Sequence, residues 1–346
     1  MKKKNILIIS RCVTDNIGDL AISRAMKSLV EELTSANVYA ADLRCEKLIS
    51  NPFLRLKHKL YNLIARMGAR EFAWKVENRG LFDVLNKVSF DLVLIGGGEL
   101  VQSNGIFPMA LDTWAKLITR KQPKAKIYLF GVGVTSHFSE KDRTHICQML
   151  QSISGAVVRD QASKENLFNL FGIKSTVIPD VVYSLKILEN KVNNLELDVR
   201  NGVLYGLTNY ERIMKYGLYA HSREAYFQKT LDAISTFGGK VKLFYTTNDD
   251  FKECLRFQSY AKSKSVSIEI AEYCDLDSLF TLLKSKETVI SPRMHGCILA
   301  DLCGCKTEPI LISPKMMSYK ASYQKPLDIV GMRTRIVEEM RQIIER

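Results

Sequence analysis

The stretch Asp91-Leu-Val-Leu-Ile-Gly-Gly-Gly-Glu99 decides the fold class, because it joins four apolar residues directly to three consecutive glycines. A short apolar run that ends at a turn signal is typical of a fully buried strand in a parallel sheet. Glycine allows a sharp turn there and a close approach of the backbone to a ligand. The stretch therefore predicts an α/β protein whose strands end at a ligand-binding edge.

The same pattern recurs on both sides of this stretch, with helical periodicity between the strands. We expect further strands at 5–9, 38–41, 126–130, 156–158 and 176–178. A polar, asparagine-rich stretch then interrupts the pattern, and a second series of strands follows at 203–207, 241–245, 267–270, 288–290 and 309–312. The two series predict two Rossmann-like, doubly wound domains that face a cleft.

The domain boundaries are placed where the composition changes. We expect an N-terminal Rossmann-like domain over 1–188, a linker over 189–201 and a C-terminal Rossmann-like domain over 202–325. The remaining residues, 326–346, predict an amphipathic helix, and in a layout of this kind such a helix can cross back over both halves.

Composition excludes several classes of protein. The 346 residues are 46% apolar and 25% charged, which is typical of a soluble globular protein and excludes a largely disordered chain. No stretch approaches the ~18 apolar residues of a membrane helix, and the short run after Met1 is interpreted as a buried strand rather than a signal peptide. Eight scattered cysteines without a C-x-x-C pair predict reduced thiols in the cytoplasm.

The net charge of +13 favours anionic partners. The sequence has no nucleic-acid-binding motif, so we expect no nucleic acid partner. The segment 53–79 is basic and amphipathic, and one hypothesis is a peripheral contact with anionic membrane in which Phe53 and Trp74 flank the contact. The alternative is a surface helix whose apolar stripe packs on the core.

Three glycine-bearing turns follow predicted strands and are expected to share one edge of the N-terminal domain. They contain Asn16, Gly18 and Asp19, then Gly97, Gly98 and Glu99, and then Gly131 and Gly133. None is a dinucleotide-binding fingerprint or a P-loop, and each turn alone is explained by a need for positive φ. Their shared position favours a substrate site, because glycine turns and helix N-termini attract anionic groups.

Charged residues end two further strands of this domain. Arg159 and Asp160 follow the strand 156–158, and Asp180 follows the strand 176–178. A guanidinium at such an edge can hold a carboxylate or a phosphate. A structural ion pair between Arg159 and Asp160 is the alternative.

The most pointed motif is Ser291-Pro-Arg293-Met-His295-Gly296, which follows a predicted strand and precedes a helical run. His295 therefore lies near a helix N-terminus beside Arg293, a setting that favours an anion. Lys315 follows the next predicted strand and is expected at the same edge, although a structural histidine and a surface lysine are the alternatives. The sequence has no metal-ligand motif and no G-x-S-x-G, so we expect no metal.

In this order, the motifs resemble those of the polysaccharide pyruvyl transferase family, over residues 5–320. They are Asn16-x-Gly18-Asp19, 91–98, Gly131-Val-Gly133, Val158-Arg159-Asp160-x-x-Ser163, Pro179-Asp180, Arg293-Met-His295-Gly296 and Lys315. The resemblance implies a fold similar to the GT-B glycosyltransferases, with phosphoenolpyruvate as co-substrate and no resident cofactor. It also implies a sugar of a bacterial capsule, exopolysaccharide or cell-wall precursor as acceptor, with a pyruvate ketal and phosphate as products.

The resemblance places the family's functional arginine, histidine and lysine at Arg159, His295 and Lys315. Met294 stands where the family usually has leucine, and Lys320 is a second candidate for the lysine.

This chemistry suits the residue types. Arg159, Arg293 and Lys315 can hold the carboxylate and phosphate of phosphoenolpyruvate, and His295 can deliver a proton to the methylene carbon. Either Asp19 or Glu99 can act as base toward the acceptor hydroxyl.

Two rival interpretations accompany this one. A GT-B glycosyltransferase would use a nucleotide-sugar donor and leave a nucleoside diphosphate. A non-catalytic glycan-assembly protein would have no need of all three functional residues. The acceptor stays open between a lipid-linked and a nucleotide-linked sugar.

Overall fold

The computed structural model describes residues 3–44, 70–103, 105–187, 200–217, 220–238, 241–323 and 326–346. Their contacts divide the chain into two units. Unit 1 comprises 1–14, 22–184 and 331–346, and unit 2 comprises 15–21 and 185–330. This grouping differs from the sequence-based boundaries, since it joins 15–21 to the second unit and the end of the chain to the first.

Unit 1 is built on a six-stranded parallel sheet in the order β2-β1-β3-β4-β5-β6. The strands are β1 (Asn5–Ser10), β2 (Asn37–Asp42), β3 (Leu92–Gly96), β4 (Lys126–Val132), β5 (Gly155–Val158) and β6 (Thr176–Val177). β1, β3 and most of β4 are buried on both faces, which is why their sequences read as continuous apolar runs rather than alternating ones. The predicted doubly wound parallel sheet is confirmed.

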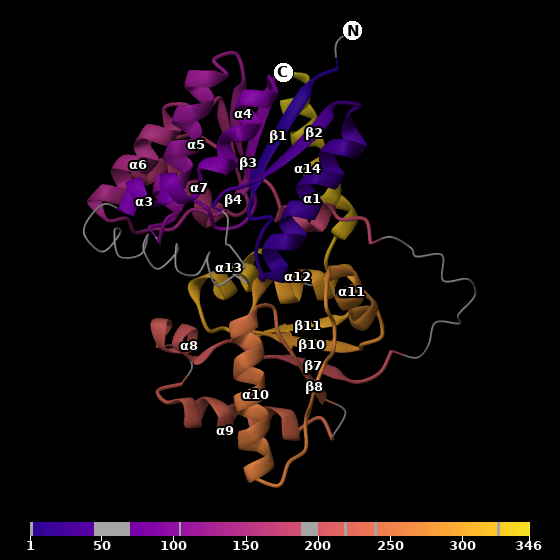
Figure 1. The fold of residues 1–346 in the computed structure, drawn as a ribbon. Coiled ribbons are helices and arrows are strands. Elements are labelled where there is room, and N and C mark those ends of the chain that lie inside the picture. Colours follow the sequence, from indigo (N-terminus) through magenta and orange to yellow (C-terminus); the bar gives the residue numbers. More distant parts are fainter. Residues whose placement is uncertain are drawn as a thin grey trace. The chain divides into compact units, whose positions relative to one another are not determined.

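Helices cover both faces of this sheet, with α5 and α6 on one side and α1 and α14 on the other (Figure 1). The helices of this part of the chain are α1 (Ile17–Leu33), α3 (Arg70–Glu77), η2 (Arg79–Asp83), α4 (Val84–Lys87), α5 (Phe107–Lys121), α6 (Glu140–Leu150), α7 (Gln161–Phe171), η3 (Val181–Ser184) and α14 (Ile329–Glu345). Arg333 of α14 donates to Glu32 at 2.7 Å and to the Ser184 carbonyl at 3.3 Å. The part of the C-terminal helix from Gly331 onward therefore packs on unit 1.

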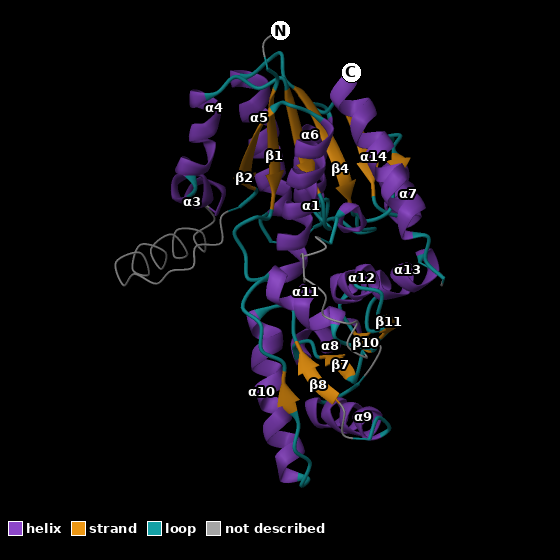
Figure 2. Cartoon of the chain, turned by 90° about the vertical axis from the view of Figure 1, so that its right-hand side faces the viewer, coloured by secondary structure: helices purple, strands orange, loops and turns teal. Residues whose placement is uncertain are grey.

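Unit 2 has a five-stranded parallel sheet in the order β11-β10-β7-β8-β9. Its strands are β7 (Val203–Gly206), β8 (Val241–Phe244), β9 (Glu269–Ile270), β10 (Thr288–Ser291) and β11 (Lys306–Pro309). Its helices are α8 (Tyr210–Tyr216), α9 (Arg223–Ser235), α10 (Asn248–Ser263), α11 (Leu276–Lys284), α12 (Met294–Leu302) and α13 (Pro314–Ser322). Figures 1 and 2 show α9 and α10 on one side of this sheet and α11 and α12 on the other.

Side-chain caps fix where the helices of unit 2 begin. Ser222, Thr247, Asp275 and Ser313 each accept a hydrogen bond from the backbone N–H three residues later, at the start of α9, α10, α11 and α13. Such caps satisfy donors that a helix end leaves without an intrahelical partner. The caps therefore determine where the loops that lead into these helices end.

The strand predicted at 309–312 is wrong by three residues. β11 uses the polar run Lys306–Pro309, and the apolar residues that follow it lie outside the sheet. Because β11 is at the sheet edge, it does not need an apolar face on both sides. Thr307 is the buried residue of this strand, and its hydroxyl donates a hydrogen bond to the Asp301 carboxylate.

The membrane hypothesis for 53–79 falls largely outside the described residues, since 45–69 are not described. Its Trp74 is described and is 7% exposed. The Trp74 ring packs edge-on against Phe82, which in turn packs against Trp114. Trp74 is therefore a core residue, and its proposed role as a membrane contact is wrong. In the described part of the chain, no helix is long and apolar enough to span a membrane.

Candidate functional site

The glycine turns at the carboxyl edge of unit 1 are tightly packed. Gly97 and Gly98 have φ of 73° and 72°, in the left-handed region that favours glycine. A Cβ on Gly97 would lie 1.8 Å from Ile22 Cγ2, and the Gly133 N–H donates to the Gly98 carbonyl at 2.7 Å. These two turns are thus held against each other, and positive φ together with close packing explains their glycines.

Arg159 follows β5 and is enclosed by three carboxylates. Its Nε donates to Asp160 Oδ2 at 3.3 Å, its Nη2 donates to Glu99 Oε2 at 3.3 Å, and its Nη1 lies 3.9 Å from Asp180 Oδ2. The guanidinium also leaves no room for a side chain at Gly133, because a Cβ there would lie 2.7–2.9 Å from Arg159 Nη2, Cζ and Nε. The structure therefore brings together five residues that the sequence singled out, Glu99, Gly133, Arg159, Asp160 and Asp180, from four different loops.

The formal charge of this unit 1 cluster, Arg159 with Glu99, Asp160 and Asp180, is −2. Only 4% of the Arg159 side chain is exposed, against 30% for Glu99. Asp160 is also the N-cap of α7, where it accepts from the Ser163 N–H at 2.7 Å. The ion pair offered as an alternative for Arg159 is present, and Glu99 is the most exposed carboxylate around it.

By its contacts, the turn at Asn16, Gly18 and Asp19 belongs to unit 2. The Ile17 N–H donates to the Thr246 carbonyl at 3.0 Å. Asn16 Oδ1 accepts from the Gly18 N–H, and Asn16 Nδ2 donates to Asp19 Oδ2 at 2.9 Å. All three glycine turns follow neighbouring parallel strands of one sheet, β1, β3 and β4.

His295 is the second residue of α12 and is 8% exposed. It packs directly on Gly18, where an added Cβ would lie 2.3 Å from His295 Nδ1. Gly18 has no positive φ, so its lack of a side chain serves to admit the imidazole rather than to turn the backbone. Gly296 is similarly confined, because a Cβ there would lie 2.5 Å from Ser291 Oγ.

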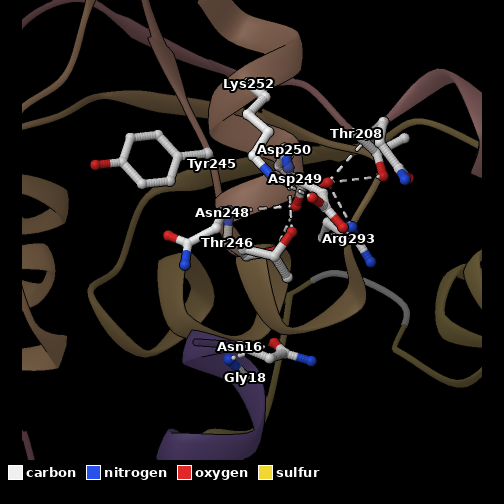
Figure 3. A network of polar contacts seen from close by, with 12 residues as sticks. Asn16, Gly18, Thr208, Tyr245, Thr246, Asn248, Asp249, Asp250, Lys252 and Arg293 are labelled. Carbon is white, nitrogen blue, oxygen red and sulfur yellow. Dashed lines mark hydrogen bonds and ion pairs between the residues drawn. The ribbon is translucent and has the colours of Figure 1, made fainter. Parts of the chain in front are cut away.

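Arg293 is the N-cap residue of α12 and pairs with Asp250, which is fully buried in the first turn of α10 (Figure 3). The Asp250 carboxylate also accepts hydrogen bonds from Thr208 and Thr246, in the loops after β7 and β8. Sequence reasoning missed Asp250 and both threonines. The polar run Thr246–Asp250 after a predicted strand was the available signal.

Two tyrosines, the buried Tyr226 and the half-buried Tyr273, hold these loops. The Tyr226 hydroxyl donates to the Thr208 carbonyl at 3.1 Å and accepts from its N–H at 3.2 Å. The Tyr273 hydroxyl makes the same pair of bonds with the backbone of Tyr245. Burial raises the pKa of both phenols, so both stay neutral.

Lys315 lies in the first turn of α13 and is half-buried, whereas Lys320 lies in its last turn and is exposed. Asp301 ties α13 to α12, because its carboxylate accepts from the Tyr319 hydroxyl at 2.5 Å. Lys315 is therefore carried by the helix that packs against the helix of His295. Among the described residues, no group of three or more His, Cys, Asp or Glu side chains could hold a metal ion.

A family model described as polysaccharide pyruvyl transferase matches residues 16–311. The chain belongs to the polysaccharide pyruvyl transferase family. Membership indicates that it is a transferase enzyme, and it confirms the resemblance seen in the motifs. A search of curated proteins found no match.

Solved structures share the fold of this pyruvyl transferase family member at low identity. The Methanocaldococcus jannaschii UDP-GlcNAc 2-epimerase in complex with UDP-GlcNAc and UDP is 14% identical, with a TM-score of 0.53 over 98% of this chain and 99% of that one. The Neisseria meningitidis UDP-GlcNAc 2-epimerase bound to UDP-GlcNAc is 13% identical, with a TM-score of 0.53 over 99% and 92%. These similarities support the predicted GT-B-like class of two parallel α/β domains, and no more than the fold.

Proposed function

We propose that the protein transfers the pyruvyl moiety of phosphoenolpyruvate to two hydroxyls of a sugar in a surface polysaccharide precursor. The observation that carries the proposal is the arrangement in unit 2: Arg293 and His295 open α12, and Lys315 opens the adjoining α13. Together with the family match, this supports assigning Arg293 and Lys315 as the cationic groups and His295 as the proton donor.

Phosphoenolpyruvate carries up to three negative charges, and its carboxylate and phosphate would be held by Arg293 and Lys315. His295 would protonate the methylene carbon while an acceptor hydroxyl attacks the central carbon, which forms a C–O bond and converts the alkene to a methyl group. The bond between that carbon and the phosphate oxygen then breaks, and phosphate leaves. Attack by the second hydroxyl closes the ketal.

The acceptor hydroxyl needs a base, and Asp19 and Glu99 are the two candidates. Asp19 is 9% exposed and accepts a hydrogen bond from Asn16. The Glu99 side chain is 30% exposed and accepts a hydrogen bond from Arg159. The base is the residue whose amide variant, Asp19→Asn or Glu99→Gln, loses more kcat.

Donor binding by the purified protein tests the proposal first. We expect phosphoenolpyruvate to raise the melting temperature and to give a calorimetric binding signal, because it binds only the folded state. Lipid-linked and nucleotide-linked sugars are then offered as acceptors, and the reaction is followed by release of phosphate and by the ketal methyl signal in NMR. Release of a nucleoside diphosphate without phosphate from phosphoenolpyruvate would overturn the proposal in favour of a glycosyltransferase.

A further inference from the structure

We propose that Asp250 is a positioning residue for the donor site, which acts by fixing the guanidinium of Arg293. This inference rests on the proposed function and deepens it. Asp250 would not touch the substrate. It would set the direction in which the remaining N–H groups of Arg293 meet the carboxylate or phosphate of phosphoenolpyruvate.

The Asp250 carboxylate collects donors from three loops at one sheet edge (Figure 3). Oδ1 accepts from Thr208 Oγ1 at 3.1 Å, from the Asn209 N–H at 3.2 Å and from Arg293 Nη2. Oδ2 accepts from Thr246 Oγ1 at 3.1 Å and from the Thr246 N–H at 3.4 Å. The donors follow β7, β8 and β10, the three central strands of the sheet. Asp250 therefore fixes Arg293 relative to the sheet and not merely to a neighbouring loop.

Charge and burial explain why this pair can orient a ligand. The Asp250 side chain is 0% exposed, and a buried carboxylate is strongly disfavoured unless a cation and hydrogen bonds compensate it. Arg293 supplies the cation through its Nη2, and its side chain stays 14% exposed. A guanidinium has five N–H donors in a fixed plane, so holding one nitrogen restricts the directions that the others can take.

A double-mutant cycle distinguishes positioning from a purely structural role. We expect Asp250→Asn to raise the KM for phosphoenolpyruvate about 10- to 100-fold, the range for losing a charged hydrogen bond, with a smaller change in kcat. In an Arg293→Gln background, the same Asp250→Asn change should alter KM less than about threefold. An equal effect in both backgrounds would overturn the inference, because Asp250 would then not act through Arg293.

Asp249→Asn is the matched control. It removes the same charge one residue earlier in α10, where Asp249 is exposed and pairs with Lys252 at 2.9 Å. We expect its KM to match that of the unaltered protein within about twofold. If Asp250→Asn does not fold, Arg293→Lys provides a second test, since it keeps the positive charge beside Asp250 and removes the planar set of guanidinium donors. A KM unchanged in Arg293→Lys would overturn the inference.

Measurements on the unaltered protein distinguish a failure of the positioning role from a failure of the proposed function. Turnover of phosphoenolpyruvate by that protein, with additive effects in the cycle, overturns the positioning role alone. Absence of any phosphoenolpyruvate binding or turnover overturns the proposed function and this inference with it.

Discussion

The carboxyl edges of the two sheets are built alike but differ in charge. Arg159 follows β5 in unit 1 and Arg293 follows β10 in unit 2, and each contacts a carboxylate that is almost fully buried. Around Arg159 there are three carboxylates, whereas Arg293 has Asp250 and is followed by His295. One strand–loop–helix construction thus supports different formal charges, −2 for the cluster around Arg159 and zero for the pair of Arg293 and Asp250.

This difference supports a division of labour between the two edges. An anionic donor would be repelled by the net negative cluster of unit 1 and attracted by the cations of unit 2. Sugar hydroxyls are neutral donors and acceptors, and carboxylates such as Glu99 bind them without a charge penalty. We therefore propose that Arg293 contributes more than Arg159 to binding the donor.

Replacing the histidine of unit 2 should have the largest effect. We expect His295→Asn to lower kcat about 10²- to 10⁴-fold, the usual contribution of a general acid, while the melting temperature changes little. Single-turnover rates of phosphate release measure it. His221→Asn is the control, because His221 is exposed in the same unit. Turnover by His295→Asn at the rate of the control would remove His295 from the mechanism.

Replacing the arginine of unit 1 should mainly affect stability. Arg159→Gln leaves three carboxylates around a buried site without their cation, and we expect the free energy of unfolding to fall by about 3–5 kcal/mol. Urea unfolding measures this change, and Arg143→Gln on the exposed face of α6 is the control. Adding Glu99→Gln should recover part of the loss, since it removes one of the three negative charges around the site. If Arg159→Gln instead raised the KM for phosphoenolpyruvate at full stability, the comparison between the two edges would fail.

Sequence patterns predicted the class of the fold and its strand ends because buried parallel strands read as apolar runs that stop at glycine or charge. They located β3 and β10, and with them Glu99 and Arg293. They failed at β11, where an edge strand is polar. The apolar residues after it have the sequence pattern of a strand, so Lys315 was expected after a strand rather than inside α13.

Contacts between residues on different loops could not be predicted from the sequence, for a different reason. Nothing local in Asp250 distinguishes it from Asp249, yet one is fully buried on Arg293 and the other is exposed on Lys252. Likewise, Gly18 reads as an ordinary turn glycine. Its close contact with His295 arises from residues 277 positions apart in the sequence, which only the fold brings together.

The contact between Gly18 and His295 gives the third prediction. Gly18→Ala would put a methyl group 2.3 Å from His295 Nδ1, so the imidazole must shift. A displacement of about 1 Å in a catalytic group can cost about 10²-fold, and we expect kcat to fall by about 10- to 100-fold. Gly80→Ala is the control, because a Cβ there has no atom within 4 Å. Equal activity of the two variants would show that the contact does not position the histidine.

The last prediction tests how unit 2 responds to alkaline pH. Burial raises the pKa of the Cys303 thiol to about 12, and it also raises the pKa of Cys254 and of Tyr226, all in unit 2. The unfolded chain releases the Cys303 proton near pH 9.0 while the folded chain keeps it. The unfolded state therefore binds fewer protons between pH 9 and about 12, and the free energy of unfolding falls as pH rises through this window.

Each such group contributes at most about 1.4 kcal/mol per pH unit, the smallest effect in this series. Hydrogen exchange of peptides from unit 2 at pH 8 and pH 10, corrected for the intrinsic exchange rate, measures the slope. Cys303→Ala should make the slope shallower, and Cys274→Ala, at an exposed cysteine of the same unit, should leave it as in the unaltered protein. A slope that Cys303→Ala does not change would mean that this thiol is not what links the stability of unit 2 to alkaline pH.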